Sequence, residues 1–158
     1  MQLSEILVPE RIVVDRDGVL IGDKRAAIGM LAKLLADAVG VSELELNELL
    51  LERERLQSTG IGDKVAIPHA SVDVPGSQAG ALLLCPKGLE FDAIDGAPVT
   101  IVFGLVGPRR STGEHLKALA RISRLLRSPT TRAELLAAND AADAFAKILA
   151  EEAPVALG

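Results

Sequence analysis

The sequence contains no tryptophan or tyrosine, three phenylalanines and one cysteine in 158 residues. Proteins that bind single-stranded nucleic acid stack the bases on aromatic rings, and this chain has few rings to offer. Its net charge of -5 also excludes a broad basic surface for duplex nucleic acid or an anionic membrane. We therefore expect no nucleic-acid partner.

A single cysteine, Cys85, cannot form a disulfide within the chain. Residues 1–10 lack the charged and then apolar pattern of a signal peptide, and no apolar run approaches the roughly 20 residues that span a bilayer. These absences predict a cytoplasmic protein without membrane insertion. Hydrophobic residues make up 49% of the chain, enough for one domain with a sizeable core.

The sequence also lacks the motifs of common cofactor sites. Its two histidines, His69 and His115, are far apart, and without an HxxxH or CxxC pair a zinc site would lack ligands. No Walker loop or GxGxxG segment indicates a nucleotide. Cys85 ends an apolar segment and is typical of a core residue rather than a nucleophile. We expect neither a metal nor an organic cofactor.

The spacing of apolar residues predicts strands that alternate with amphipathic helices, hence a layered α/β fold. The predicted strands are residues 11–14, 65–67, 79–85 and 99–106, and the predicted helices begin after Asp23, Ser42, Ser111, Ser128 and either Asn139 or Asp140. Capping boxes are expected at Ser42 and Ser111. Residues 99–106 are almost continuously apolar, which predicts a central strand covered on both faces. Residues 88–96 are expected to form a turn region or a short hairpin.

Residues 58–70, with the sequence STGIGDKVAIPHA, have the features of a phosphate site. The glycines allow unusual backbone conformations, and Pro68 restricts how the chain leaves the short strand, so His69 is expected at a rigid strand end. Near neutral pH an imidazole has a free lone pair and can act as base, ligand or nucleophile. Ser58 and Thr59 add donors for phosphate oxygens. The alternative is a histidine that only makes a hydrogen bond at a turn.

Two further residues are candidates for the same site. Arg53 lies seven residues after Leu46 and is expected on the apolar face of its helix, where a guanidinium needs an anion unless it extends along the surface. His115 is expected in the first turn of a helix, on the core-facing stripe with Leu119 and Ile122. Helix N-termini attract phosphate, although His115 could equally be a buried histidine with a satisfied ring.

These segments resemble the enzyme IIA domains of the phosphoenolpyruvate-dependent phosphotransferase system, of the fructose, mannitol and nitrogen-regulatory class. The similarity extends to RERLQSTG before the histidine segment, LEFDAIDGAPVTIVF after it and GEHLKALARISRLLR further on. It implies a mixed sheet between helical layers, with residues 1–152 as the IIA domain and 153–158 as a flexible tail. Lys64 departs from the small residue usual in the family, and Gly104 interrupts a strand of bulky residues.

The resemblance implies a phosphotransferase in which His69 accepts a phosphoryl group from a phosphohistidine carrier protein similar to HPr. A backbone carbonyl is expected to hold the other nitrogen of the His69 ring. His115 and Arg53 would assist, and the donors of Ser58 and Thr59 would hold phosphoryl oxygens. The next partner would be an enzyme IIB domain or a regulatory target. Without fused IIB or IIC domains, a stand-alone carrier is expected, regulatory as in the nitrogen-type proteins or part of a sugar system.

Two other functions fit the same residues. One is a regulatory module of the same fold that binds partners without catalysis. The other is a small hydrolase that uses His69 with Asp73 or Asp92.

Overall fold

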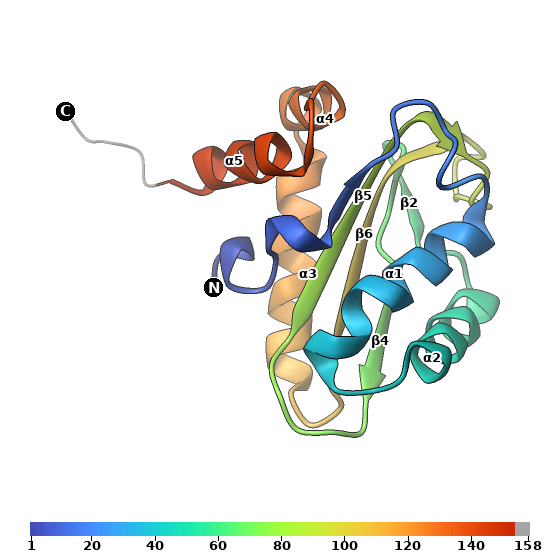
Figure 1. Cartoon of the computed structure of the whole chain (residues 1–158), viewed down its shortest axis with the longest axis vertical. Helices are drawn as coiled ribbons and strands as arrows, with labels where there is room; N and C mark the ends of the chain where they lie inside the picture. The colour runs from blue at the N-terminus through green and yellow to red at the C-terminus, as the bar shows by residue number, and fades with distance from the viewer. Residues whose placement is uncertain (154–158) are drawn as a thin grey trace.

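The computed structural model describes residues 1–153, which are built around a six-stranded mixed sheet (Figure 1). The strands are β1 (Ile12–Val14), β2 (Gly60–Gly62), β3 (Val65–Ala66), β4 (His69–Val72), β5 (Ala79–Leu89) and β6 (Val99–Pro108). The order across the sheet is β1-β5-β6-β3-β2, and β4 also pairs with β6. The helices are α1 (Lys24–Val39), α2 (Glu43–Leu56), α3 (Thr112–Arg127), α4 (Pro129–Leu136) and α5 (Ala141–Glu152), with short 3-10 turns at Leu3–Glu5 and Pro9–Arg11.

Strand β6 is the central strand, as its apolar sequence predicts. It pairs antiparallel with β5 on one edge and parallel with β3 and then β4 on the other. All ten of its residues are buried. A strand covered on both faces has no solvent-exposed side, which explains why apolar residues follow one another without alternation.

Two cores lie on opposite faces of the sheet. Val102 and Val106 belong to the core shared with α1 and α2, whereas Phe103 and Leu105 belong to the core shared with α3, α4 and α5. The predicted fold, a single α/β domain with a mixed sheet between helical layers, is therefore confirmed. Gly104 fits this arrangement, since a Cβ there would lie 2.8 Å from a methyl group of Leu31 on α1.

Most of the predicted helix starts are confirmed by their capping bonds. Side-chain oxygens of Asp23, Ser42, Ser128 and Asp140 each accept a hydrogen bond from a backbone N–H in the first turn of α1, α2, α4 and α5. The prediction of a capping box at Ser111 is wrong. This residue precedes α3 with φ −104° and ψ 48°, which is not the extended conformation of a capping residue, and its side chain makes no capping bond.

Some predicted boundaries differ from the structure. β5 runs to Leu89, beyond the predicted end at Cys85, because residues near its end still pair with β6, with Leu89 opposite Val99. Of the predicted tail 153–158, all but Ala153 lies outside the described residues. Within the described part of the chain, the helices are too short or too polar to cross a bilayer.

The hairpin between β2 and β3 turns through Asp63 and Lys64, whose φ angles are 56° and 64°. Two consecutive residues with positive φ are typical of tight hairpin turns, where glycine or asparagine is preferred. Lys64 is exposed and has no side-chain hydrogen bond among the described residues that would offset this conformation. Glycine, which lacks a Cβ, would relieve backbone strain at this position.

We expect Lys64→Gly to raise the free energy of unfolding by about 1 kcal/mol, because glycine adopts positive φ without the steric cost that a Cβ brings. Urea unfolding of both proteins measures the difference. The control is Lys33→Gly on the exposed face of α1, which should lower stability by about 1 kcal/mol. A Lys64→Gly protein as destabilised as the Lys33 variant would contradict the strain at this turn.

Candidate functional site

The two histidines lie together although they are distant in the sequence. His69 begins β4, and His115 lies in the first turn of α3; their ring centroids are 5.8 Å apart and the ring planes are tilted by 56°. Both elements are attached to β6. β4 pairs with its second half, with His69 opposite Leu105, and α3 begins shortly after its end.

His69 lies at the start of a strand rather than at the end of the predicted strand 65–67. β3 ends at Ala66, and Pro68 separates it from β4, although both strands pair with β6. Across this break the backbone remains bonded to the sheet, since Leu105 N donates to Pro68 O at 3.0 Å. His69 is therefore held at the start of β4 by backbone pairing with β6, rather than at the end of the predicted strand.

The expected backbone carbonyl is present beside His69. Nδ1 of the ring lies 2.7 Å from Ile67 O. A carbonyl only accepts hydrogen bonds, so Nδ1 carries the proton in the neutral ring and Nε2 carries the lone pair. The nitrogen available for chemistry is Nε2.

His115 has a similar contact from a different source. Its Nδ1 is 2.8 Å from Oε1 of Gln78, and the His115 side chain is almost fully buried. Thus, among the described residues, each histidine has Nδ1 bonded to an oxygen acceptor while Nε2 makes no hydrogen bond.

The surroundings of the two rings favour their neutral forms. Burial is the main cause that lowers the pKa of His69, and the positive charge of Arg53 lowers it further, against an opposing effect of the Ile67 carbonyl. Burial also lowers the pKa of His115, and proximity to His69 adds to this effect. The neutral form therefore predominates in both rings at neutral pH.

The histidines line an open pocket of about 570 Å³. Its lining comprises Leu49, Glu52, Arg53, Arg55, Leu56, His69, Ala70, Ser71, Arg109 and His115. Three arginines and one glutamate make this surface locally positive, although the whole chain has a net charge of -5. A small anion is the ligand class that such a pocket favours.

The sequence predicted Arg53 on the core-facing stripe of α2. In the structure Arg53 lines the pocket but does not lie on that stripe. That stripe runs through Leu46, Leu50 and Glu54, and Arg53 is half-buried beside it. Its Nη1 donates to Gln57 O at 2.9 Å, and the structure shows no carboxylate paired with it within residues 1–153. The remaining guanidinium donors are free for a ligand.

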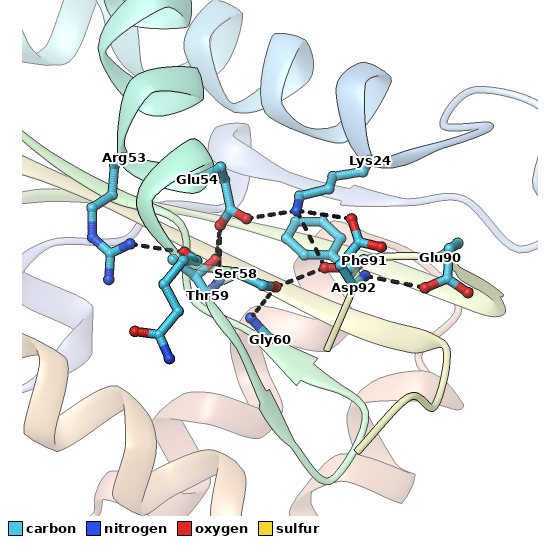
Figure 2. Close-up of polar contacts among 10 residues, drawn as sticks. Lys24, Arg53, Glu54, Ser58, Thr59, Gly60, Glu90, Phe91 and Asp92 are labelled. Carbon is cyan, nitrogen blue, oxygen red and sulfur yellow. Dashed lines mark hydrogen bonds and ion pairs between the residues drawn. The ribbon is translucent and has the colours of Figure 1, made fainter. Parts of the chain in front are cut away.

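Ser58 and Thr59 do not line the pocket, contrary to the direct phosphate contact predicted for them. The Ser58 hydroxyl donates to Phe91 O at 2.7 Å and accepts from Gly60 N (Figure 2). Thr59 is buried, and both its N–H and its hydroxyl donate to Oε1 of Glu54. Their donors hold the segment that leads to β2.

Glu54 lies at the centre of this internal network. Its second oxygen, Oε2, is 2.8 Å from Nζ of Lys24, which also donates to Phe91 O at 3.3 Å and lies 3.7 Å from Asp92 (Figure 2). The Glu54 side chain is only 4% exposed. The network ties the start of α1 to the end of α2 and to the loop after β5.

The sequence-based reasoning missed Glu54, Gln78 and Arg109. A signal existed for Glu54, because it continues the Leu46 and Leu50 stripe at a spacing of four. Arg109 follows the central strand directly, which places it at the edge of the pocket. Gln78 has no comparable signal in the sequence.

The residues of the other candidate functions are placed differently. Asp73 lines a separate hollow beside Arg110, and Asp92 is paired with Lys24; neither forms a hydrogen bond with His69 in the described part of the chain. No group of three histidine, cysteine or acidic residues within residues 1–153 is arranged to hold a metal ion. Cys85 is buried, which raises the pKa of its thiol to about 12.

The fold and the paired histidines define a small α/β protein with a histidine site at the edge of a mixed sheet. The family described as "Phosphoenolpyruvate-dependent sugar phosphotransferase system, EIIA 2" matches residues 5–151. The chain belongs to this family, as its motifs predicted.

Three relatives illustrate the range of the similarity. The chain is 36% identical to a nitrogen regulatory protein of Bradyrhizobium diazoefficiens over 141 residues, which cover 89% of this chain and 90% of that protein. The crystal structure of nitrogen regulatory protein IIA-Ntr from Neisseria meningitidis has a TM-score of 0.84 at 32% identity, covering 92% and 98% of the two chains. Enzyme IIA for mannitol from Escherichia coli, solved in complex with phosphorylated enzyme IIB, shares the fold, with a TM-score of 0.71 at 18% identity and coverage of 91% and 97%.

We expect Lys24→Met to lower the free energy of unfolding by about 2 kcal/mol, because it leaves the Glu54 carboxylate buried without its ion pair. The effect falls below that of a fully buried pair because Lys24 is partly exposed. Urea unfolding measures the change, and Lys24→Met/Glu54→Gln should recover part of the loss. Lys33→Met on the exposed face of α1 is the control; equal stability of the two single variants would show that Lys24 does not compensate Glu54.

Stability should also depend on pH through the two histidines. In the unfolded chain their pKa is about 6.5, whereas the folded protein lowers both pKa values. As the pH falls below about 6.5, the unfolded chain therefore takes up protons that the folded protein does not, and the free energy of unfolding decreases. Above that value both states have neutral rings and the contribution is constant.

Denaturant unfolding between about pH 7.5 and about pH 5.5 tests this dependence. A His69→Gln/His115→Gln variant serves as the comparison, since its carboxylates titrate as in the original protein while the two rings are gone. It should lose less stability on acidification. Identical pH dependence of the two proteins would contradict the lowered pKa values.

Proposed function

We propose that this protein is a phosphocarrier that accepts a phosphoryl group on Nε2 of His69 from a phosphohistidine carrier protein. The observation that carries the proposal is the hydrogen bond from Nδ1 of His69 to Ile67 O, because it orients a neutral nucleophile at a rigid position. The adjacent His115 and the arginines of the pocket suit an anion beside that nitrogen.

The transfer needs little covalent work from the protein. The lone pair on Nε2 of His69 forms a bond to phosphorus, while the bond from phosphorus to the donor imidazole breaks. The electron pair of the broken bond stays with the donor ring, which leaves as a neutral imidazole with the proton on its other nitrogen. The phosphorylated His69 ring keeps its own proton on Nδ1, where the Ile67 carbonyl stabilises the positive charge.

The other side chains have distinct roles in this proposal. The free donors of Arg53, together with Arg109 at the edge of the pocket, bind phosphoryl oxygens. His115 assists by taking up a proton and donating it in a hydrogen bond, since a nearby phosphoryl dianion raises the pKa of an imidazole. Ser58 and Thr59 act indirectly by holding the segment between α2 and β2.

The relatives support both a regulatory and a transport version of this function. The regulatory version, in which the phosphorylation state controls binding to a target protein, is favoured by the similarity to nitrogen regulatory proteins along most of the chain. The complex of the mannitol protein with enzyme IIB supports a IIB domain as the alternative acceptor. In either case residues 1–152 form the functional unit.

The direct experiment is incubation with a phosphorylated histidine carrier protein. We expect one phosphoryl group per chain, labile in acid and stable in base, because a bond from phosphorus to imidazole nitrogen has this stability. His69→Ala should not be labelled, whereas His115→Ala should be labelled slowly and pass the group on poorly. An acid-stable adduct, or full labelling of His69→Ala, would exclude the proposal.

A regulatory module without catalysis makes the opposite prediction for target binding. In that case the phosphoryl donor has no effect on target binding, and His69→Ala binds the target as tightly as the original protein does.

Arg53→Lys tests the role of the guanidinium. Lysine offers a point charge in place of a planar fork of donors, so one charge-assisted hydrogen bond is lost and the phosphorylation rate should fall roughly tenfold to a hundredfold. The rate is measured at matched donor concentration, with thermal melting as a control for folding. Arg25→Lys, on the exposed face of α1 and away from the histidines, should transfer at the original rate. Equal rates for the two variants would remove Arg53 from the site.

A further inference from the structure

Gln78 holds one nitrogen of the His115 ring from the position just before β5. Its Oε1 is 2.8 Å from Nδ1 of His115, and the two residues are 6% and 9% exposed. An amide oxygen only accepts hydrogen bonds, and the amide does not titrate. In the neutral ring the proton therefore lies on Nδ1, and Nε2 carries the lone pair.

The nitrogen of the same amide contributes no hydrogen bond among the described residues. Nε2 of Gln78 is buried and has no hydrogen-bond partner within residues 1–153. An unpaired N–H in the interior is destabilising, and an apolar side chain of similar length would avoid that cost. The contact that favours glutamine at this position is therefore the bond to His115.

Gly107 provides the space for this amide. The antiparallel register places Ala79 opposite Val106, and continuing it by one residue brings Gln78 opposite Gly107. A Cβ at Gly107 would lie 2.1 Å from Cδ, Oε1 and Nε2 of Gln78. The orientation of the Gln78 side chain thus depends on the absence of a side chain on the central strand.

We propose that Gln78 is a positioning residue that makes Nε2 the proton-exchanging nitrogen of His115. The inference rests on the proposed function of His69. When His69 becomes phosphorylated, His115 takes up a proton from the solvent. Because Nδ1 already carries a proton held by Gln78, the new proton adds to Nε2, which then donates to a phosphoryl oxygen.

The charge on His115 also depends on its ionisable neighbours. Those that share its pocket are Glu52, Arg53, Arg55, His69 and Arg109. The amide of Gln78 adds no charge, so it selects the nitrogen without itself changing with pH.

The tautomer can be measured without any phosphoryl donor. The chain has two histidines, so nitrogen chemical shifts of isotope-labelled protein resolve both rings, and His69→Gln assigns them. We expect His115 to retain a protonated Nδ1 throughout the pH titration, with Nε2 as the nitrogen that changes. A neutral His115 ring protonated on Nε2 in the original protein would overturn the inference.

Variants at two positions test the cause. Gln78→Met removes the acceptor at similar volume. Gly107→Ala displaces the amide while keeping both partners. In each variant the neutral His115 ring should no longer carry its proton preferentially on Nδ1. Gln78→Glu retains an acceptor, keeps Nδ1 protonated and, through its charge, raises the pKa of His115. Thr131→Val, a buried polar-to-apolar change on α4, is the control and should leave both rings unchanged. An unchanged tautomer in Gln78→Met would show that Gln78 does not select it.

Kinetics link the tautomer to transfer. Gln78→Met should be phosphorylated roughly twofold to tenfold more slowly, the effect of one lost neutral hydrogen bond, with little change in thermal melting. Gln78→Glu should restore the rate, with its pH profile displaced upward. If Gln78 acts only by packing, Gln78→Met should have a lower melting temperature and Gln78→Glu an unshifted pH profile. This pair of results would overturn the inference.

The two proposals can fail separately. If His69 of the original protein accepts no phosphoryl group, the proposed function fails, whereas the tautomer of His115 still reports on Gln78. If His69 is phosphorylated but the Gln78→Met rate is unchanged, only the positioning role is overturned.

Discussion

The structure depends on the pairing of β6 with three other strands. One edge of β6 pairs with β5, and the other is shared by β3 and β4, which meet at the break at Pro68. His69 lies where pairing resumes, and α3 leads back from the end of β6 to place His115 beside it. Sheet hydrogen bonds therefore position His69, whereas the start of α3 and the bond to Gln78 position His115.

Two neighbouring charged residues of α2, Arg53 and Glu54, have different electrostatic roles. Glu54 is buried and neutralised internally by Lys24, so its carboxylate supports the segment before β2 without facing the histidines as a ligand. Arg53, the preceding residue on α2, faces the pocket and has no acidic partner within the described residues. Adjacent positions on one helix thus serve stability and anion binding, because a rotation of about 100° per residue directs them to different surroundings.

Much of the architecture was predictable because it depends on local patterns. Apolar spacing predicted the helices, continuous apolar sequence predicted the central strand, and capping residues at Asp23, Ser42 and Asp140 predicted helix starts. Ser111 failed as a cap because it closes the turn after β6, where its N–H donates to Pro108 O, and its backbone is not extended as capping requires. The motif also predicted the carbonyl contact of His69, since its partner Ile67 is only two residues away.

The sequence by itself determined the family, the layered fold and which side chains are chemically suited to a phosphoryl group, because these follow from residue type and short-range spacing. Only the tertiary structure decided which of those side chains meet. It brought His115 to His69 and Arg53 to the pocket edge. It also turned Thr59 inward, where it donates to the buried Glu54, and turned Ser58 toward the backbone carbonyl of Phe91. Gln78 is distant in the sequence from both His115 and Gly107, and strand register brings Gln78 opposite Gly107, which no local pattern encodes.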